Sequence, residues 1–316
     1  MGKTESATAW EAIPSKSAAK SSRRPMKTCN EYHFAENIED ALLALSQAGG
    51  KATLLAGGTD LLLDIQQGRH EIADTLVDIT NIPEMRVLER REDHIFIGAA
   101  VTHRTITTSP LINEHAPALT EASGLIGGPQ VRNVATLGGN VAHALPAADG
   151  TIALIALDSS AEIASPKGFR TMPLIHLFAG PGKNTLDPET EILTGFHLPL
   201  KQTRSGSAFK RIMRPQGVAI AILNCAVWLQ REGDQIASVR ISVGPSGPTP
   251  RRMTTSEAAL IGKSPTTENI ETAYQALLSD ASFRTSRHRA TLEYRQKMAG
   301  VLLRETLQLA WERASE

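Results

Sequence analysis

The sequence has few cysteines, few aromatic residues and no excess of either charge, and each shortage excludes a class of protein. Two cysteines among 316 residues cannot ligate a four-cysteine iron–sulfur cluster or a cysteine-rich zinc site. Aromatic residues make up 4%, so we expect no stacking platform for single-stranded nucleic acid. Because 33 basic residues balance 33 acidic ones, we expect no nucleic-acid partner.

Long hydrophobic runs are also missing. The longest apolar run, residues 218–229, is interrupted by Asn224 and is too short to cross a bilayer, so we expect no transmembrane segment. Residues 1–25 are rich in Ser, Lys and Ala and are expected to form a mobile tail. The low cysteine content suits a reducing compartment, and we expect a cytoplasmic protein.

What is present is typical of a globular chain of two or three domains, with 41% hydrophobic and 21% charged residues. Polar and breaker residues at 201–207 indicate a domain boundary. Strands followed by helices after it predict an α+β C-terminal domain. We expect residues 130–149 to be irregular, and Leu292, Met298, Val301, Leu302 and Leu309 to lie on one side of the last helix. The periodicity predicts helices over residues 37–48, 117–125, 255–261, 267–278 and 287–312, and strands over 51–56, 75–79, 94–100, 208–213, 218–230 and 236–243.

The strongest local motif is the glycine turn at residues 54–61. A short apolar run leads into Gly57-Gly58-Thr59-Asp60, where glycines permit a tight turn with exposed backbone N–H groups. Such a concave set of donors binds phosphate oxygens. Taken alone, the motif favours the simpler interpretation of a hairpin turn.

A second motif repeats this chemistry at residues 130–140. It ends in Thr136-Leu137-Gly138-Gly139-Asn140, again a glycine pair between a hydroxyl residue and a polar one. Two such loops, one from each lobe of a domain, can hold a diphosphate from both sides. Together they favour a dinucleotide site.

Two charged residues are further candidates. Asp149 precedes an apolar run, where its simpler role is that of a helix N-cap. Lys210 lies in a predicted strand, where its simpler role is solvation. As a cation beside a reducible ring, Lys210 would stabilise an anionic reduced form.

Several other motifs are missing. The sequence has no G-x-G-x-x-G, no G-x-S-x-G and no zinc-binding spacing, and Gly262-Lys263-Ser264 lacks the first glycine of a P-loop because residue 257 is Glu. We predict no catalytic residue and no metal ligand in this chain. His143 is the least unsuitable acid–base candidate.

These motifs together resemble those of the FAD-binding medium subunits of molybdenum hydroxylases, from about residue 26 to the C-terminus. Further matching segments are Leu186 with residues 191–193, residues 207–210, and Tyr294-Arg295. The resemblance implies an α+β fold: a two-lobed FAD-binding domain of the vanillyl-alcohol-oxidase (PCMH) type, residues 26–203, with lobes 26–80 and 81–203. A C-terminal domain of the CO dehydrogenase flavoprotein type would follow at residues 204–316.

The resemblance also implies a site for non-covalently bound FAD. Residues 54–61 would line the diphosphate, a second loop would contact it, and Leu193 and Lys210 would lie by the isoalloxazine ring. Ile126 stands where xanthine dehydrogenase has an aromatic residue, so stacking at that point is lost. The implied cofactor-binding residues are Leu54, Leu55, Ala56, Gly57, Gly58, Thr59, Asp60, Leu61, Ile126, Thr136, Gly138, Gly139, Asn140, Asp149, Leu193 and Lys210.

The implied function is that of an electron-transfer subunit of an oxidoreductase. Molybdenum cofactor and [2Fe–2S] clusters would belong to a large and a small partner subunit, in a dimer of heterotrimers. Electrons would pass through FAD to an external acceptor such as NAD, a quinone or another compound. Two alternatives remain open: a free-standing flavin-dependent reductase of the same superfamily, and a scaffold subunit that has lost FAD.

Overall fold

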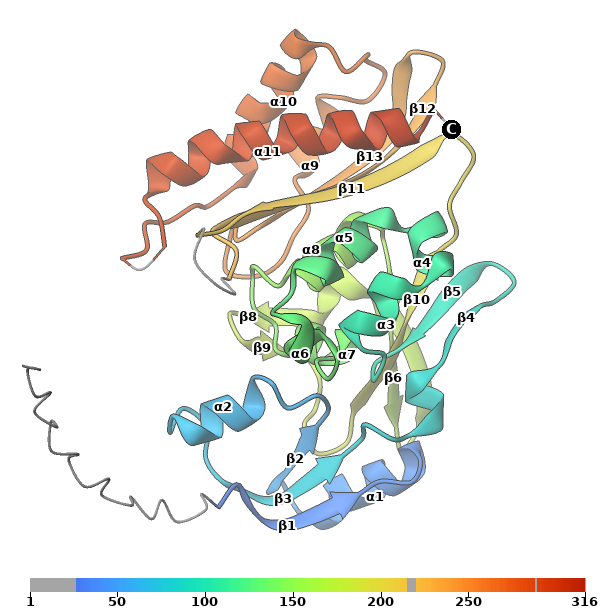
Figure 1. The fold of residues 1–316 in the computed structure, drawn as a ribbon, viewed down its shortest axis with the longest axis vertical. Helices are drawn as coiled ribbons and strands as arrows, with labels where there is room; N and C mark the ends of the chain where they lie inside the picture. The colour runs from blue at the N-terminus through green and yellow to red at the C-terminus, as the bar shows by residue number, and fades with distance from the viewer. Residues whose placement is uncertain (1–26, 215–219, 288, 316) are drawn as a thin grey trace, which may run out of the picture.

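The structure is a computed structural model that describes residues 27–214, 220–287 and 289–315. The tail expected over residues 1–25 lies outside these ranges. Figure 1 shows three larger sheets that follow one another along the long axis of the molecule, with helices between and beside them. The N-terminal sheet lies at the bottom of this view and the C-terminal sheet at the top.

The first sheet is parallel, with β3 between β1 and β2. The helix α1 (Ile38–Gln47) buries its apolar side, and the Asn37 side chain caps it by accepting a hydrogen bond of 2.8 Å from the Asp40 N–H. The chain leaves β2 through the first glycine turn and enters α2 (Leu61–Gln66). The strands are β1 (Cys29–Phe34), β2 (Ala52–Leu55) and β3 (Ala73–Asp78).

The second sheet is antiparallel, in the order β4-β5-β10-β6-β7. Its strands are β4 (Leu88–Arg90), β5 (His94–Gly98), β6 (Ser160–Ser165), β7 (Gly168–Pro173) and β10 (Ile192–Pro199), with a small hairpin of β8 (Phe178–Gly180) and β9 (Lys183–Asn184). Between β5 and β6 lie α3 (His103–Thr108), α4 (Pro110–His115), α5 (Pro117–Leu125), α6 (Pro129–Arg132), α7 (Leu137–Ala142) and α8 (Asp149–Ala156). Single 3₁₀ turns are η1 (Pro83–Arg86) and η2 (Leu174–Leu177).

The third sheet is antiparallel, in the order β11-β12-β13. It lies between α11 on one face and α5 and α8 on the other (Figure 1). Alternation along β12 explains this position, because Leu223, Val227 and Leu229 join the C-terminal core while Ala226 and Trp228 join the core of the N-terminal part. The elements are β11 (Ser205–Ile212), β12 (Leu223–Glu232), β13 (Gln235–Gly244), α9 (Thr254–Ala258), α10 (Thr267–Asp280) and α11 (Leu292–Arg313).

Two expectations about these elements were wrong. Residues 130–149 are not irregular, because α7 lies within them and α6 overlaps their start. The buried side of α11 also differs in part from the expected one: Leu302 is buried, whereas Met298, Val301 and Leu309 are only half-buried. Close approach explains the difference, since a Cβ on Gly206 of β11 would lie 2.2 Å from the Ala310 carbonyl oxygen. The residues that α11 buries are Arg295, Ala299, Gly300, Leu302, Leu303, Thr306, Leu307 and Ala310.

The chain passes from the second sheet to the third between Pro199 and Ser205. The exact division at residues 203 and 204, and that of the lobes at 80 and 81, stays a prediction. None of the described helices combines the length and hydropathy needed to cross a membrane. Within the described ranges, no group of three or more His, Cys, Asp or Glu side chains is arranged to hold a metal ion.

Candidate FAD-binding site

The first glycine turn lies at the carboxyl end of β2, the end of a parallel strand at which ligands bind in open α/β sheets. Gly58 has a φ of +67°, which favours glycine. Leu55 is buried, whereas residues 56–59 are half-buried and Asp60 is exposed. Among the described residues, none accepts a hydrogen bond from the backbone N–H groups of residues 57–60. The turn therefore offers four adjacent free donors.

The two glycine motifs meet in space. A Cβ on Gly57 would lie 2.1 Å from the Val134 carbonyl oxygen and 2.8 Å from the Ala135 Cα, so only glycine permits this contact. At the other end of α7, the side chains of Asp60 and His143 approach to 3.7 Å. The first turn thus touches the chain just before and just after α7, the helix that carries Gly138 and Gly139.

The second motif is built as the N-terminus of α7. The Thr136 side chain caps the helix by accepting a hydrogen bond of 3.0 Å from the Gly139 N–H. The N–H groups of Leu137 and Gly138 donate to the carbonyls of Val101 and Ala99, at 3.0 and 2.9 Å. These donors are therefore already used within the protein, in contrast to those of the first turn.

Its two glycines have different surroundings. A Cβ on Gly138 would lie 2.6 Å from Ala99, so Gly138 serves packing. A Cβ on Gly139 would meet one atom outside the helix backbone, Thr136 Oγ1 at 3.1 Å. That contact is tight, but no further atom outside the helix backbone lies within 4 Å among the described residues, so glycine at position 139 keeps this side of α7 free for a closely approaching ligand.

Ile126 lies at the C-terminus of α5, shortly before the second motif along the chain. Arg132 Nη1 donates hydrogen bonds to the carbonyl oxygens of Ile126 and Gly127, at 3.1 and 2.8 Å. Ile126 is half-buried. Arg132 thus holds the segment before α6 in place.

Asn140 connects the second motif to α8. Its side-chain oxygen accepts a hydrogen bond of 3.1 Å from the Thr151 N–H. Asp149, at the start of α8, is 6% exposed. The N-cap role considered for Asp149 is wrong, because Ala148 occupies that position and no side chain caps the helix.

The Asp149 carboxylate instead reaches the C-terminal domain. It pairs with Arg211 of β11, and Asn224 of β12 donates to it a hydrogen bond of 2.6 Å. Burial raises the pKa of the Asp149 carboxyl, and the charge of Arg211 and the hydrogen bond from Asn224 oppose that rise. Arg211 Nε and Asn224 Oδ1 are buried without a hydrogen-bond partner among the described residues.

Sequence reasoning missed both Arg211 and Asn224. Asn224 did carry a signal, because a polar residue inside an otherwise apolar strand is usually held by a hydrogen bond. Arg211 had no comparable signal. It follows Lys210 in a strand, and successive side chains of a strand face opposite ways, so the sequence does not tell which of the two cations faces the site. Arg211 faces Asp149, whereas Lys210 Nζ lies 3.1 Å from Glu305 of α11.

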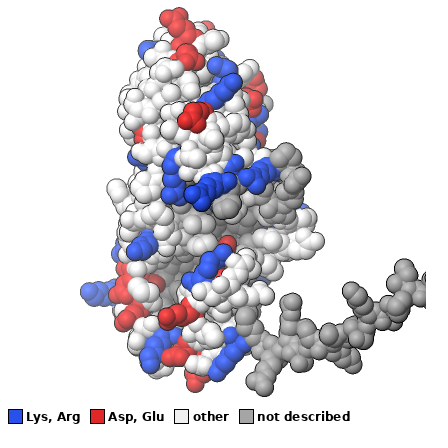
Figure 2. Space-filling view, turned by 90° about the vertical axis from the view of Figure 1, so that its left-hand side faces the viewer, with Lys and Arg blue, Asp and Glu red and all other residues white. Residues whose placement is uncertain are grey.

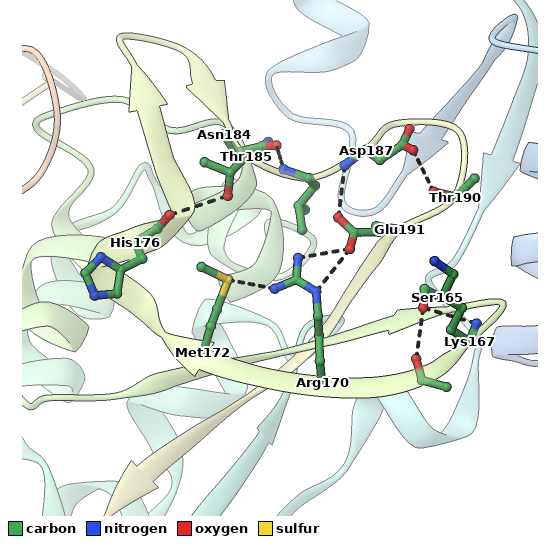
Figure 3. A network of polar contacts seen from close by, with 12 residues as sticks. Ser165, Lys167, Arg170, Met172, His176, Asn184, Thr185, Asp187, Thr190 and Glu191 are labelled. Atoms are coloured by element: carbon green, nitrogen blue, oxygen red, sulfur yellow. Dashed lines mark hydrogen bonds and ion pairs between the residues drawn. The ribbon is translucent and has the colours of Figure 1, made fainter.

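Leu193 lies in β10 and is 5% exposed. The loop before β10 is fixed by the network in Figure 3, in which Arg170 donates two hydrogen bonds to Glu191 Oε1, at 3.0 and 2.9 Å. The other oxygen of Glu191 accepts from the Asp187 N–H at 3.0 Å. Asn184 Nδ2, at the end of β9, donates to the Ala142 carbonyl at the end of α7. This network ties the approach to Leu193 to the second glycine motif.

The predicted residues therefore fall into three groups. Gly57, Asp60 and the chain around Gly139 lie together. Asn140 and Asp149 extend that group through α8. Lys210 meets none of these residues by a hydrogen bond or ion pair among the described residues.

Comparison with known proteins agrees with this arrangement. A family described as "FAD binding domain in molybdopterin dehydrogenase" matches residues 25–201. A second family, "CO dehydrogenase flavoprotein C-terminal domain", matches residues 207–310. The fold and the paired glycine turns thus define a two-domain flavoprotein.

Two named relatives narrow the class of flavoprotein. The carbon monoxide dehydrogenase medium chain of Hydrogenophaga pseudoflava is 31% identical over 285 residues, 90% of this chain and 98% of the relative. A putative xanthine dehydrogenase FAD-binding subunit of Escherichia coli K12 is 33% identical over 279 residues, 87% of this chain and 94% of the relative. The chain belongs to the FAD-binding medium subunits of the molybdenum hydroxylase family.

A solved structure supports the same conclusion. A chain of carbon monoxide dehydrogenase from Hydrogenophaga pseudoflava superimposes with a TM-score of 0.86 at 30% identity, covering 92% of this chain and 99% of that one. The protein is accordingly an FAD-dependent electron-transfer subunit of an oxidoreductase. The free donors of the first turn and the open space at Gly139 fit a dinucleotide cofactor.

Proposed function

We propose that the two glycine turns hold FAD non-covalently, with its diphosphate against the N–H groups of residues 57–60. The observation that carries this proposal is the set of free donors beside α7. Backbone N–H groups that point into one concavity bind phosphate oxygens without a charged side chain. Leu54, Leu55, Ala56 and Leu61 would support this turn from β2 and α2.

The second motif would touch the cofactor without donating hydrogen bonds to it, because the backbone N–H groups of residues 137–139 already donate to acceptors within the protein. Gly139 would allow the cofactor to approach α7 closely, and Gly138 would keep the helix against Ala99. Thr136 and Asn140 would hold the two ends of this segment in place. Ile126 would offer an apolar side chain without stacking.

Asp149, Leu193 and Lys210 complete the proposed site near the isoalloxazine ring. Asp149 would take its place in the site while it stays bonded to Arg211 and Asn224. Leu193 is 5% exposed, so it would support the surroundings of the ring from within β10. Lys210 would have to leave Glu305 to contact the ring, and its positive charge would favour the reduced cofactor.

Bound FAD supplies the ability to take up electrons one at a time and pass them on in pairs. We propose that the electrons come from [2Fe–2S] clusters of a small subunit, after substrate oxidation at a molybdenum centre in a large subunit. The assembly would be a dimer of heterotrimers, and NAD, a quinone or another compound would be the external acceptor. Relatives named as medium chains support the multi-subunit organisation.

We further propose that the complex works in the cytoplasm. Both cysteines, Cys29 and Cys225, are free, as is usual in a reducing compartment.

The cofactor site is tested by filling the space at Gly139. In the full chain, Gly139→Ala and Gly139→Val should lower the affinity for FAD progressively, by on the order of tenfold or more for valine. The reason is that the added methyl groups enter the space proposed for the cofactor. Bound flavin is measured by visible absorption, and the fold by circular dichroism.

Gly124→Val is a matched control, because Gly124 also lies in a helix and an added Cβ would be 3.7 Å from its nearest neighbour. This variant should keep its flavin. Gly57→Ala is a less suitable test, since its Cβ would collide with the backbone at Val134 and disturb the fold itself. Undiminished FAD affinity in a folded Gly139→Val protein would overturn the assignment of the second motif.

A further inference from the structure

The linker between β10 and β11, residues 200–204, is held by hydrogen bonds at both of its ends. At its C-terminal end, the N–H of Arg231 in β12 donates to the Arg204 carbonyl oxygen at 3.0 Å. At its N-terminal end, the Lys201 N–H donates to Nδ1 of His115 at 3.1 Å. His115 is the last residue of α4, and Figure 1 shows the linker passing beside that helix.

The hydrogen bond from Lys201 fixes the protonation state of the His115 imidazole. A backbone N–H can only donate, so the ring nitrogen that faces it must carry a lone pair. The imidazole is therefore neutral, with its proton on the other nitrogen. Among the hydrogen bonds between described residues, this is the only one that joins the linker to the helices between β5 and β6. Attachment of the linker to these helices thus depends on a neutral histidine.

The surroundings of His115 favour this neutral form. Its side chain is 9% exposed, and this burial lowers the pKa of His115. The exposed carboxylate of Glu114, 3.8 Å from His115 Nε2, opposes that shift. The positive charges of Arg90 in β4 and of Lys201 in the linker add to it. The pKa of His115 therefore lies below its ordinary value of 6.5.

A cavity of about 370 Å³ lies beside this contact. Residues of α4, α5 and the linker line it, together with residues of β11, β12 and α11. Arg313 of α11 also lines the cavity, and its charge is paired with Glu121 at 2.6 Å. The linker is therefore not packed on every side and has room to leave α4 without disturbing either core.

This cavity is separate from the hollow on the opposite side of the molecule. Figure 2 shows the side that lies to the left in Figure 1, where Lys and Arg side chains form a band above a hollow. The first glycine turn and α2 lie toward that side, whereas the linker lies on the right in Figure 1. A change at the linker can therefore be followed independently of the proposed FAD site.

We propose that His115 is a pH-sensitive anchor of the linker between the two domains. At neutral pH its Nδ1 holds the Lys201 N–H. When the imidazole takes up a proton, both ring nitrogens become donors, so the acceptor is lost and two donors face each other. The linker then leaves α4, while its bond to β12 persists. Because the neutral form is favoured, this release takes place below pH 6.5.

Hydrogen exchange measured by mass spectrometry tests the anchor directly, because the Lys201 amide is the group that is released. The full chain is studied between about pH 5 and about pH 8. Each exchange rate is divided by that of an unstructured peptide at the same pH. Protection of residues 200–204 should fall about tenfold toward low pH, as expected for the loss of one hydrogen bond. Protection of β12 should stay constant, which excludes global unfolding.

Two variants separate the hydrogen bond from the charge of the imidazole. In His115→Asn, the side-chain oxygen replaces Nδ1 as acceptor but does not titrate, so the linker should stay protected over the whole pH range. In His115→Leu the acceptor is missing, so protection should be low throughout. His176→Asn is the matched control, because His176 is exposed and its imidazole has no hydrogen-bond partner among the described residues. This variant should behave as the parent does.

Two further variants keep the hydrogen bond and change the charges around it. Lys201→Met removes a positive charge but retains the backbone N–H, so the midpoint of release should move to higher pH. Glu114→Gln removes the opposing charge and should move the midpoint to lower pH. The proposal is overturned if protection of the parent linker does not change with pH. It is also overturned if His115→Asn loses protection at low pH as the parent does, or if neither charge variant moves the midpoint.

Discussion

At the scale of single residues, four glycines that look alike in the sequence have three different tasks. Gly57 allows one backbone to lie against another, and Gly138 allows α7 to pack on Ala99. Gly58 supplies a positive φ, and Gly139 leaves open space. The sequence predicted that these positions matter, but their separate roles depend on neighbours that are distant along the chain. The meeting of Gly57 with Val134 is therefore visible in the structure alone.

A buried histidine near the second motif makes stability depend on pH. His103 is fully buried, its Nδ1 lies 3.3 Å from Ser123 Oγ, and its Nε2 has no hydrogen-bond partner among the described residues. Burial, helped by the charge of Arg132, lowers the pKa of His103 to about 4. Because the unfolded chain takes up this proton near pH 6.5, the folded state should lose stability as the pH falls from about 6.5 to about 4.

The expected loss is about 3 kcal/mol across that window, and it should level off below it. Urea unfolding at a series of pH values measures it. His103→Gln should reduce the slope, because glutamine does not titrate. The exposed His70 is a matched control, and His70→Gln should leave the slope unchanged. An equal slope in parent and His103→Gln would show that other groups cause the effect.

At the scale of elements, the sequence predicted helices and strands best where the apolar periodicity is strong and extends over many residues. The helix with Asn37 as its N-cap and the strands β11 and β13 are present close to their expected positions. The strand expected over residues 218–230 begins at Leu223, and residues 218–219 lie outside the described residues. The short helices α6 and α7 were missed, because four or six residues show no clear period and isolated helices of this length are unstable. Their stability comes from tertiary contacts, such as the bonds from residues 137 and 138 to the chain after β5.

The cap of α7 gives a prediction for such an element. Thr136→Val keeps the shape of the side chain but leaves the Gly139 N–H without its acceptor. We expect a loss of about 1 kcal/mol in the free energy of unfolding and weaker FAD binding, because Gly139 is no longer held in place. Urea unfolding and flavin titration measure the two effects.

Thr136→Ser restores the acceptor and should restore both properties. If valine and serine behave alike, the hydrogen bond does not contribute. If valine lowers stability but not FAD affinity, the cap serves the fold without positioning the cofactor.

At the scale of the whole molecule, three ion pairs between described residues join the C-terminal sheet and α11 to the preceding part of the chain, and these three have the same polarity. The carboxylates of Glu121, Asp149 and Asp158 lie on the N-terminal side, and their partners Arg313, Arg211 and Arg240 lie on the C-terminal side. Three apolar residues, Phe209, Ala226 and Trp228, belong to the N-terminal core although they lie in the third sheet. The sequence offers 33 basic residues and no means of choosing among them, so these pairings could not be predicted.

These pairs differ in burial, and their contributions should differ accordingly. Arg211→Met would leave the Asp149 carboxylate buried without its cation, which should cost about 3–5 kcal/mol in the free energy of unfolding. Asp158 is half exposed to solvent beside Arg240 and has a φ of +59°, so Asp158→Asn, which tolerates this backbone conformation, should cost less than about 1 kcal/mol. Urea unfolding of both variants measures the difference, and equally small losses would mean that water reaches Asp149.

The double variant Asp149→Asn/Arg211→Met distinguishes two causes of lost stability: an unpaired buried carboxylate, and the loss of the attraction between the two charges. It removes the buried charge together with its counter-charge, while asparagine can still accept the hydrogen bond from Asn224. If the unpaired carboxylate causes the loss, the double variant should be more stable than Arg211→Met alone, because burying an unpaired charge costs more than removing a pair. If the loss in the double variant instead equals the sum of the losses in the two single variants, Arg211 stabilises the domain contact through packing. The junction would then depend on shape rather than on charge, and the shared polarity of the three pairs would have no part in holding the domains together.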